Sequence, residues 1–370
     1  MGNVKFIVSG GGTGGHIFPA LSIADGLKYC FPGCEILFVG AEGKMEMEKV
    51  PAAGYKIIGL PVAGFHRGEL WRNFAFFPKL ILSMMKAKKV VKDFQPDVVI
   101  GVGGYASGPV LRVATKLGIP CVLQEQNSFA GVTNKILGKK ARKICVAYDR
   151  MDRFFPSDKI IFTGNPVRKG LMSVTPKSME AHEYFKVATG QRVILIVGGS
   201  LGARTLNQGV LAKLDLIKRS DIVIIWQSGK YYYKDILAQL DSNPVENIRL
   251  MEFIPRMDLA YSLADVVISR AGAGTISELC IVGAPSILVP SPNVSEDHQT
   301  FNAMSLVEKG AAVLVKDSEA VEQLIPVAVE LVNNKGKCLD LSNNIKKLAT
   351  PHATEDIVAV ITKLLKPEND

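Results

Sequence analysis

Residues 6–16 read FIVSGGGTGGH, and residues 194–204 read ILIVGGSLGAR. In each stretch an apolar run rich in β-branched residues breaks into glycines, and a helix-like sequence follows. This order predicts a strand, a tight turn and a helix N-terminus, where backbone N–H groups and the positive end of the helix can hold phosphate. One copy opens each half of the chain, so we expect an α/β protein with two Rossmann-like domains facing each other across a cleft. Such a protein suits an enzyme that acts on a phosphorylated sugar or a nucleotide.

The size and charge of the chain limit the classes of protein that it can be. Its 370 residues exceed the length at which a single core usually stops growing, and 48% of them are hydrophobic, enough for two cores. The formal net charge of +9 favours a nucleic acid, an anionic membrane surface or an anionic substrate as partner. Nucleic acid is least favoured, because no recognition helix, zinc pattern or base-stacking sheet signature accompanies the charge.

Cysteine usage and hydropathy favour a cytoplasmic protein. The six cysteines are scattered without pairs at metal-ligand spacing, which predicts free thiols in a reducing compartment and no structural metal. A predicted strand begins within about four residues of the N-terminus, so we expect no signal peptide. The longest candidate for a membrane span, residues 74–85, is too short and contains Lys79.

Apolar runs alternate with helix-like stretches along both halves of the chain. In the first half we expect helices at 18–28 and 109–117 and strands at 4–9, 35–39, 98–102, 120–124, 144–147 and 160–163. In the second half we expect helices at 317–333 and 339–348 and strands at 193–197, 221–227, 248–252, 266–269, 286–289 and 312–315. Strands that are apolar throughout imply parallel sheets covered by helices on both faces.

The segment GNPVR at residues 164–168 predicts the domain boundary. Asn165 precedes Pro166 and is therefore disfavoured in helical geometry. We expect an N-terminal domain over residues 1–165 and a C-terminal domain over 166–350. A last helix at about 352–366 is expected to pack back on the first domain.

The first glycine loop contains the dinucleotide fingerprint Gly10-x-Gly12-x-x-Gly15, which is a weak signal alone. The fingerprint also needs an acidic residue at the end of the second strand, where Glu42 is the only near candidate. The alternative is a tight turn that serves packing only. However, the loop has more glycines than a turn requires, which favours close approach of a ligand to the backbone.

His16 is the best candidate for a general base, because an imidazole can accept a hydroxyl proton at physiological pH. Its alternative role is to orient a ligand or cap the helix. Glu125, a second candidate catalytic residue, and Asn127 follow another predicted strand. The loop at 103–109 should lie at the same sheet edge, where ligands gather. The alternative for Glu125 and Asn127 is to cap a helix that includes residues 132–137.

Residues 270–278, RAGAGTISE, form the strongest single motif. They follow an apolar strand, and Glu278 could accept hydrogen bonds from both hydroxyls of a ribose. Its alternative is a surface or capping role. Residues 291–302 are rich in hydrogen-bonding groups suited to a sugar. The chain contains no Asp-x-Asp that could seat a divalent ion, so backbone N–H groups and arginine must stabilise a leaving diphosphate.

Residues 65–92 combine an aromatic stretch with a lysine-rich helix. Aromatic residues beside lysines suit contact with an anionic lipid surface. The alternative, a packed helix with a solvated basic face, fits the sequence about as well.

Seven motifs in order resemble the lipid II-forming N-acetylglucosaminyltransferases of glycosyltransferase family 28. The motifs are GGTGGH at 11–16, GGYASGP at 103–109, EQN at 125–127, GNPVR at 164–168, GGSLGAR at 198–204, GAGTISE at 272–278 and HQTFNA at 298–303. The resemblance covers residues 4 to about 310. It implies the GT-B fold, with the active site between two Rossmann-like domains.

The resemblance also implies the reaction. A hexosyltransferase of this family moves GlcNAc, with inversion, from UDP-GlcNAc to the MurNAc 4-hydroxyl of lipid I, which is undecaprenyl-diphospho-MurNAc-pentapeptide. It needs no cofactor and no tightly bound metal. It works in peptidoglycan synthesis as a peripheral protein on the cytoplasmic side of the cell membrane, where other cell-wall synthesis proteins are potential partners.

By match of motif, the C-terminal domain holds the UDP-sugar. Arg168 and Ser200 would face the diphosphate, Ile254 the uracil, and Gln299, rather than His298, the sugar hydroxyls. The expected donor-binding residues are Thr13, Gly14, Gly15, Asn127, Arg168, Ser200, Ile254, Ala273, Gly274, Thr275, Ser277, Glu278 and Gln299. The expected residues at the acceptor diphosphate are Gly11, Gly12, Gly104 and Tyr105.

Three other functions stay open on the sequence. A UDP-GlcNAc 2-epimerase would share the ribose-binding glutamate but would not need a basic aromatic membrane patch. The hypothesis of an NAD-dependent oxidoreductase is weakened by two features. The first unit lacks an acidic residue placed to bind a ribose, and the chain has a second glycine loop. A non-catalytic nucleotide-binding scaffold at the membrane would not depend on His16 or Glu278.

Overall fold

A computed structural model describes residues 3–62, 76–199 and 201–365 of the chain. The chain divides into two compact units. The first comprises Met1–Val167 and His352–Asp370, and the second comprises Arg168–Pro351. The sequence boundary expected after residue 165 lies just before this division.

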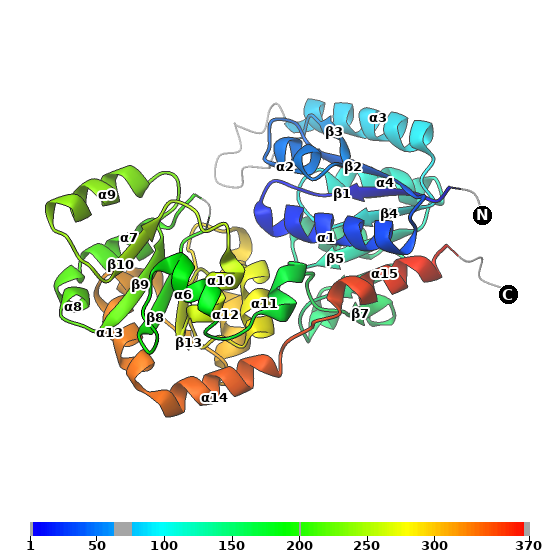
Figure 1. Cartoon of the computed structure of the whole chain (residues 1–370). Helices are drawn as coiled ribbons and strands as arrows, with labels where there is room; N and C mark the ends of the chain where they lie inside the picture. Colours follow the sequence, from blue (N-terminus) through cyan, green and yellow to red (C-terminus); the bar gives the residue numbers. More distant parts are fainter. Residues whose placement is uncertain (1–2, 63–75, 200, 366–370) are drawn as a thin grey trace. The chain divides into compact units, whose positions relative to one another are not determined.

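The described strands of the first unit form a seven-stranded sheet in the order β3-β2-β1-β4-β5-β6-β7 (Figure 1). Each of their pairings is parallel. The strands are β1 Lys5–Ser9, β2 Glu35–Ala41, β3 Lys56–Leu60, β4 Val98–Gly101, β5 Cys121–Glu125, β6 Lys143–Val146 and β7 Ile160–Phe162.

Helices cover both faces of this sheet, because successive side chains of an apolar strand point to opposite faces. Phe6 and Val8 pack in one core with α1 and α15, while Ile7 packs in another with α3, α4 and α5. The helices of the unit are α1 Gly14–Cys30, α2 Glu46–Ala52, α3 Phe76–Phe94, α4 Ser107–Lys116, α5 Val132–Gly138 and α15 Ala353–Lys363. Near the end of the chain, α15 packs against α1, with Thr354 and Val358 over Gly26.

In the second unit the described strands form a six-stranded parallel sheet in the order β10-β9-β8-β11-β12-β13. They are β8 Arg192–Val197, β9 Ile222–Gln227, β10 Ile248–Met251, β11 Val266–Ser269, β12 Ser286–Leu288 and β13 Val313–Leu314. The same alternation holds, since Val193 and Leu195 face one core and Ile194 and Ile196 the other.

The helices of the second unit are divided between the two faces. One face is covered by α6 Met179–Phe185, α10 Met257–Leu263, α11 Ala273–Val282 and α12 His298–Val307. The other is covered by α7 Arg204–Leu211, α8 Leu214–Lys218, α9 Tyr233–Ser242 and α13 Ala320–Asn333, and α14 Lys335–Lys346 contributes to both cores.

The strand order of each sheet indicates where a ligand would bind. In both sheets the chain first builds outward in one direction and then in the other, so the order reverses between β1 and β4 and between β8 and β11. Ligands of open α/β sheets bind outside the carboxyl ends of the strands at such a reversal. Both glycine loops follow a strand that borders one of these points, β1 and β8.

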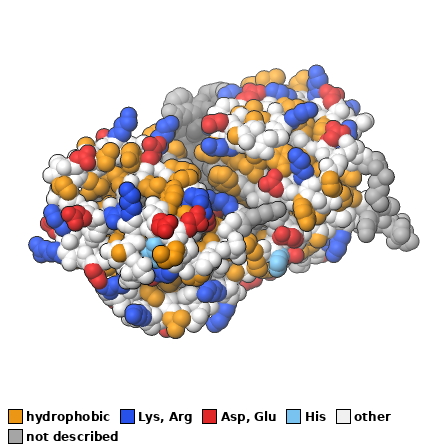
Figure 2. Space-filling view, viewed as in Figure 1, with side chains coloured by type: hydrophobic (Ala, Val, Ile, Leu, Met, Phe, Trp, Pro, Cys, Tyr) orange, Lys and Arg blue, Asp and Glu red, His pale blue; other side chains and the backbone are white. Residues whose placement is uncertain are grey.

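The α/β class with parallel sheets is confirmed. The sequence prediction omitted β3 and α2 in the first unit and α8, α9, α10 and α12 in the second. On the face of the molecule drawn in Figure 2, lysines and arginines are scattered among acidic and apolar side chains. The positive net charge is therefore not gathered into a single patch on that face.

Candidate functional site

Glu278 is the centre of the candidate donor site in the second unit. It lies on α11, and its side chain is 11% exposed. The Nε of Arg168 donates to its Oε1 at 2.8 Å, and the buried hydroxyl of Tyr261 donates to its Oε2 at 3.1 Å. Burial raises the pKa of this carboxyl, while the charge of Arg168 and the hydrogen bonds from Arg168 and Tyr261 oppose the rise. Hydrogen bonds from Arg168 and Tyr261 thus fix the orientation of the Glu278 carboxyl group.

The N-terminus of α11 is open to a ligand. Gly272 is its N-cap residue and has no side chain with which to cap the helix. A side chain at Gly274 would meet only open space. The Ser277 hydroxyl donates to the Ala273 carbonyl at 2.9 Å, within the helix. Uncapped N–H groups at a helix N-terminus suit an anion such as phosphate. Ala273, Gly274 and Thr275 begin this helix and lie at the carboxyl end of β11.

Ile254 and Gln299 are placed in different ways. The Ile254 side chain is completely buried, and its N–H donates to the Gln227 Oε1 at 3.0 Å. A nucleobase could therefore meet Ile254 only through its main chain. Gln299 lies in the first turn of α12, and its Oε1 accepts from the Ser291 N–H at 2.8 Å. Ser200, expected at the diphosphate, lies outside the described residues.

In the first unit, the loops that follow β1 and β4 pack against each other. Thr13 is the N-cap residue of α1, and its Oγ1 lies 3.1 Å from the Nδ1 of His16. The His16 ring lies directly against Gly103, where a Cβ would come within 2.8 Å of the ring. Gly104 has φ +83° and contacts the backbone of Gly11, so only glycine fits there. Gly14 and Gly15 form the first turn of α1.

The Gly12 N–H, expected at the acceptor diphosphate, is already bonded. It donates to the Oε2 of Glu46 at 2.9 Å, and the Ala41 N–H donates to the Oε1 at 2.9 Å. Glu46 is 1% exposed, at the start of α2. This buried carboxylate ties the first glycine loop to the end of β2. Glu42, considered from the sequence as the nearest acid, instead pairs with Lys86 at 2.8 Å.

Glu125 is buried and faces its own loop. Its oxygens accept from the N–H groups of Asn127 and Gly131, at 3.1 and 3.0 Å, and from the Nδ2 of Asn134 at 2.9 Å. Burial raises the pKa of this carboxyl, against the effect of those bonds. Because Gly131 is the N-cap residue of α5, the geometry favours the capping alternative for Glu125. Tyr105 is 52% exposed and lies in the neighbouring loop.

Two residues of these sites escaped the sequence analysis. Glu46 gave no signal, because its bond to Gly12 spans 34 residues and no helix was predicted over α2. Tyr261 gave no signal, because it lies in an apolar stretch and meets Glu278 only through tertiary packing. In the described ranges, no three His, Cys, Asp or Glu side chains gather so as to hold a metal ion. Nor, among those residues, is any helix long and apolar enough to cross a bilayer.

Two family models match the chain in sequence order. The Glycosyltransferase family 28 N-terminal domain matches residues 6–146, and the Glycosyltransferase family 28 C-terminal domain matches residues 193–357. The chain belongs to glycosyltransferase family 28. The family expected from the seven motifs is thus confirmed.

Relatives in this family match the chain from end to end. A protein of Parabacteroides distasonis is 53% identical over 365 residues, which are 99% of this chain and 99% of the relative. One of Flavobacterium psychrophilum is 54% identical over 368 residues, or 100% of both chains. Both are named UDP-N-acetylglucosamine–N-acetylmuramyl-(pentapeptide) pyrophosphoryl-undecaprenol N-acetylglucosamine transferase.

A solved structure of the same family agrees with the fold. The crystal structure of Acinetobacter baumannii MurG is 30% identical and superposes with a TM-score of 0.75 over 97% of this chain and 99% of its own. The fold is therefore GT-B, with two Rossmann-like units. The expectation that the two units face each other across a cleft stays a prediction.

Proposed function

We propose that this protein transfers GlcNAc from UDP-GlcNAc to the MurNAc 4-hydroxyl of undecaprenyl-diphospho-MurNAc-pentapeptide, lipid I, giving lipid II for peptidoglycan. One observation carries the proposal: relatives more than half identical over the whole chain carry the name of this reaction. The family membership makes the protein a glycosyltransferase. The reaction inverts the anomeric carbon by direct displacement.

The second unit binds the donor. The N-terminus of α11 holds the diphosphate, and Glu278 accepts the ribose hydroxyls. Arg168 then exchanges its bond with Glu278 for the diphosphate, where it stabilises the leaving UDP. Ile254 meets the uracil through its main chain, and Gln299 meets the sugar. The open space at Gly274 and the buried, aimed carboxylate of Glu278 support this assignment.

The first unit binds the acceptor. Gly11 and Gly104, with Tyr105, lie at the acceptor diphosphate, while Thr13, Gly14, Gly15 and Asn127 lie toward the sugar. His16 removes the proton of the acceptor hydroxyl. Its ring is held in place by the contact with the Thr13 hydroxyl and by packing against Gly103. Glu125 supports the loop of Asn127 rather than reacting. Since Gly12 donates to Glu46, we assign no diphosphate contact to the Gly12 N–H.

We place the protein on the cytoplasmic side of the cell membrane, bound peripherally to anionic lipid through residues of about 65–92. Residues 63–75 lie outside the described residues. Over the described part of this segment, exposed Ile81, Leu82 and Met85 stand beside lysines of α3. We also expect other cell-wall synthesis proteins among its partners.

Transfer of labelled GlcNAc from its UDP donor to a lipid I analogue, with EDTA present, tests the proposal. We expect transfer in the wild type and loss of donor binding in Glu278→Ala. His16→Ala should reduce turnover by about 10²–10⁴-fold, as loss of a general base does. A nearly unchanged rate would remove His16 from that role.

A control incubation with UDP-GlcNAc alone separates the enzyme classes. A UDP-GlcNAc 2-epimerase would convert the free nucleotide sugar, whereas a transferase would leave it intact. Conversion without acceptor, or transfer that stops in EDTA, would contradict the proposal.

A further inference from the structure

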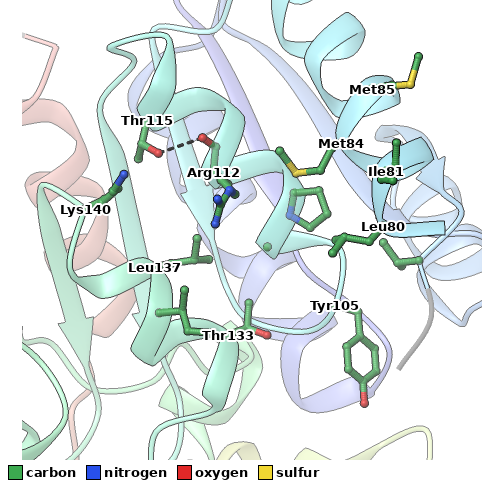
Figure 3. Close-up of a pocket in the computed structure, with 14 residues that line it drawn as sticks. Leu80, Ile81, Met84, Met85, Tyr105, Arg112, Thr115, Thr133, Leu137 and Lys140 are labelled. Atoms are coloured by element: carbon green, nitrogen blue, oxygen red, sulfur yellow. Dashed lines mark hydrogen bonds between the residues drawn. The ribbon is translucent and has the colours of Figure 1, made fainter. Parts of the chain in front are cut away.

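An apolar pocket of about 640 Å³ lies within the first unit, between α3, α4 and α5. Figure 3 shows Leu80, Ile81 and Met84 of α3 on one side, and Thr133 and Leu137 of α5 on the other. The volume is in the range of pockets that bind small molecules or part of a larger ligand. Of the residues assigned above to glycosyl transfer only Tyr105 lines this pocket, and Ile81 and Met85 were assigned only to lipid contact.

The pocket is bordered by large apolar side chains that water reaches. Ile81 is 61% exposed, Met85 65% and Ile136 60%. Exposed apolar side chains that cluster around a hollow are typical of a binding site. The hollow between these side chains has room for an inserted chain, in addition to the lipid contact proposed for α3.

Two basic side chains also line the pocket. Arg112 of α4 and Lys140, just after α5, both line the pocket and both are exposed. Neither has an ion-pair partner among the described residues. An apolar hollow with cations on its wall fits a ligand that joins a hydrocarbon chain to an anionic group.

The pocket shares a loop with the proposed acceptor site. Tyr105 and Gly108 line it, and Gly104, directly before Tyr105, contacts the backbone of Gly11 in the first glycine loop. If the diphosphate of a ligand lies at that loop, the part of the ligand bonded directly to the diphosphate would therefore lie in the pocket.

We propose that this pocket binds the first isoprene units of the acceptor, the part of its polyprenyl chain nearest the diphosphate. The inference rests on the proposed function, since the relatives are named for a pyrophosphoryl-undecaprenol substrate. Such a substrate has the chemistry of the pocket: a branched hydrocarbon chain that suits its apolar walls, joined to an anionic diphosphate.

A matched pair of variants on α3 tests the proposal. Ile81 lines the pocket, whereas Leu82, 54% exposed on the same helix, does not. Two detergent-free acceptors are compared, one with a four-isoprene chain and one with a methyl group on the same diphospho-MurNAc-pentapeptide. We expect Ile81→Gln to lower the preference in kcat/KM for the prenylated acceptor by roughly tenfold, through KM. Leu82→Gln should keep the preference.

A binding measurement separates this inference from the proposed reaction. Geranylgeranyl diphosphate should bind the wild type and Leu82→Gln in calorimetry, and should bind Ile81→Gln and the pocket-filling Thr133→Trp at least about tenfold more weakly. Failure of the wild type to transfer to either acceptor would overturn the proposed function, yet this binding would still test the pocket.

The competing occupant is the bilayer itself. Phosphatidylglycerol vesicles are therefore titrated with the same two α3 variants. Equal loss of vesicle binding in both is what the lipid contact proposed for α3 predicts. An acceptor preference that stays unchanged in Ile81→Gln would leave that contact as the only role of this face and overturn the inference. A preference lost only in Ile81→Gln supports it.

Discussion

Glu278, which we propose accepts the ribose hydroxyls, is oriented by the phenol of Tyr261. The Tyr261 hydroxyl is buried and donates to the Oε2 of Glu278 at 3.1 Å, from a neighbouring helix on the same face of the sheet. When UDP draws Arg168 away, Tyr261 would remain to hold the carboxylate. If Glu278 binds the ribose as proposed, we expect Tyr261 to act as a positioning residue for the donor site.

Tyr261→Phe should weaken UDP binding by about 1–3 kcal/mol, the usual effect of leaving a buried acceptor without its donor. It should also change the pH dependence. Burial already raises the pKa of Glu278, and the Tyr261 donor opposes that rise, so the variant's pKa is raised further. Ribose hydroxyls need the ionised carboxylate. On acidification, UDP affinity should therefore fall at a higher pH in the variant than in the wild type, as measured by calorimetry.

Tyr55→Phe is the matched control. Its hydroxyl donates to the Oδ1 of Asp25 at 2.6 Å in the first unit, and the two tyrosines are similarly buried, at 8% and 5% exposed. This change should leave UDP affinity and its pH profile unaltered. If Tyr261→Phe lowers UDP affinity by the same factor at every pH, Tyr261 has a packing role only.

The first glycine loop depends on a helix that follows the neighbouring strand. Glu46, at the start of α2, accepts from the N–H groups of Gly12 and Ala41. In Glu46→Gln one amide N–H₂ must face a backbone N–H. We expect a loss of about 1–3 kcal/mol in unfolding free energy and a higher KM for the acceptor, with UDP affinity unchanged. Urea unfolding and initial rates measure these effects.

Glu42→Gln, a few residues earlier, is the control. Glu42 pairs with Lys86 at an exposed site, where such pairs contribute roughly 0–1 kcal/mol. Equal effects of the two substitutions would show that Glu46 is not a special support of the loop.

These two elements also show where sequence reasoning succeeds and fails. The glycine loops, the strands before them and Glu278 could be predicted, because φ > 0 at glycine and apolar strand patterns are local properties. Glu46 and Tyr261 could not, since each acts through a partner 34 or 17 residues away that only the fold brings near. Arg168 was expected at the diphosphate, and its bond to Glu278 depends on the same tertiary packing.

For the whole molecule, the assignment of donor and acceptor to separate units predicts where UDP protects the chain. The units have separate sheets and separate cores. A ligand stabilises the structure that it binds, by about 2.7 kcal/mol at a hundred times its Kd. Saturating UDP should therefore slow amide hydrogen exchange in α11 and in the strands β8 and β11 beside it. The β1–β4 core of the first unit should be much less affected.

The Glu278→Ala protein separates binding at this site from binding elsewhere. Its exchange pattern with UDP should equal that of the free protein, because the ribose loses its acceptor and the affinity falls. Protection that appears first in α1 and the loop after β4 would instead place the nucleotide at the first glycine loop. In that event the two loops would exchange roles, and the acceptor pocket between α3, α4 and α5 would lose its diphosphate neighbour, so this one measurement tests both assignments together.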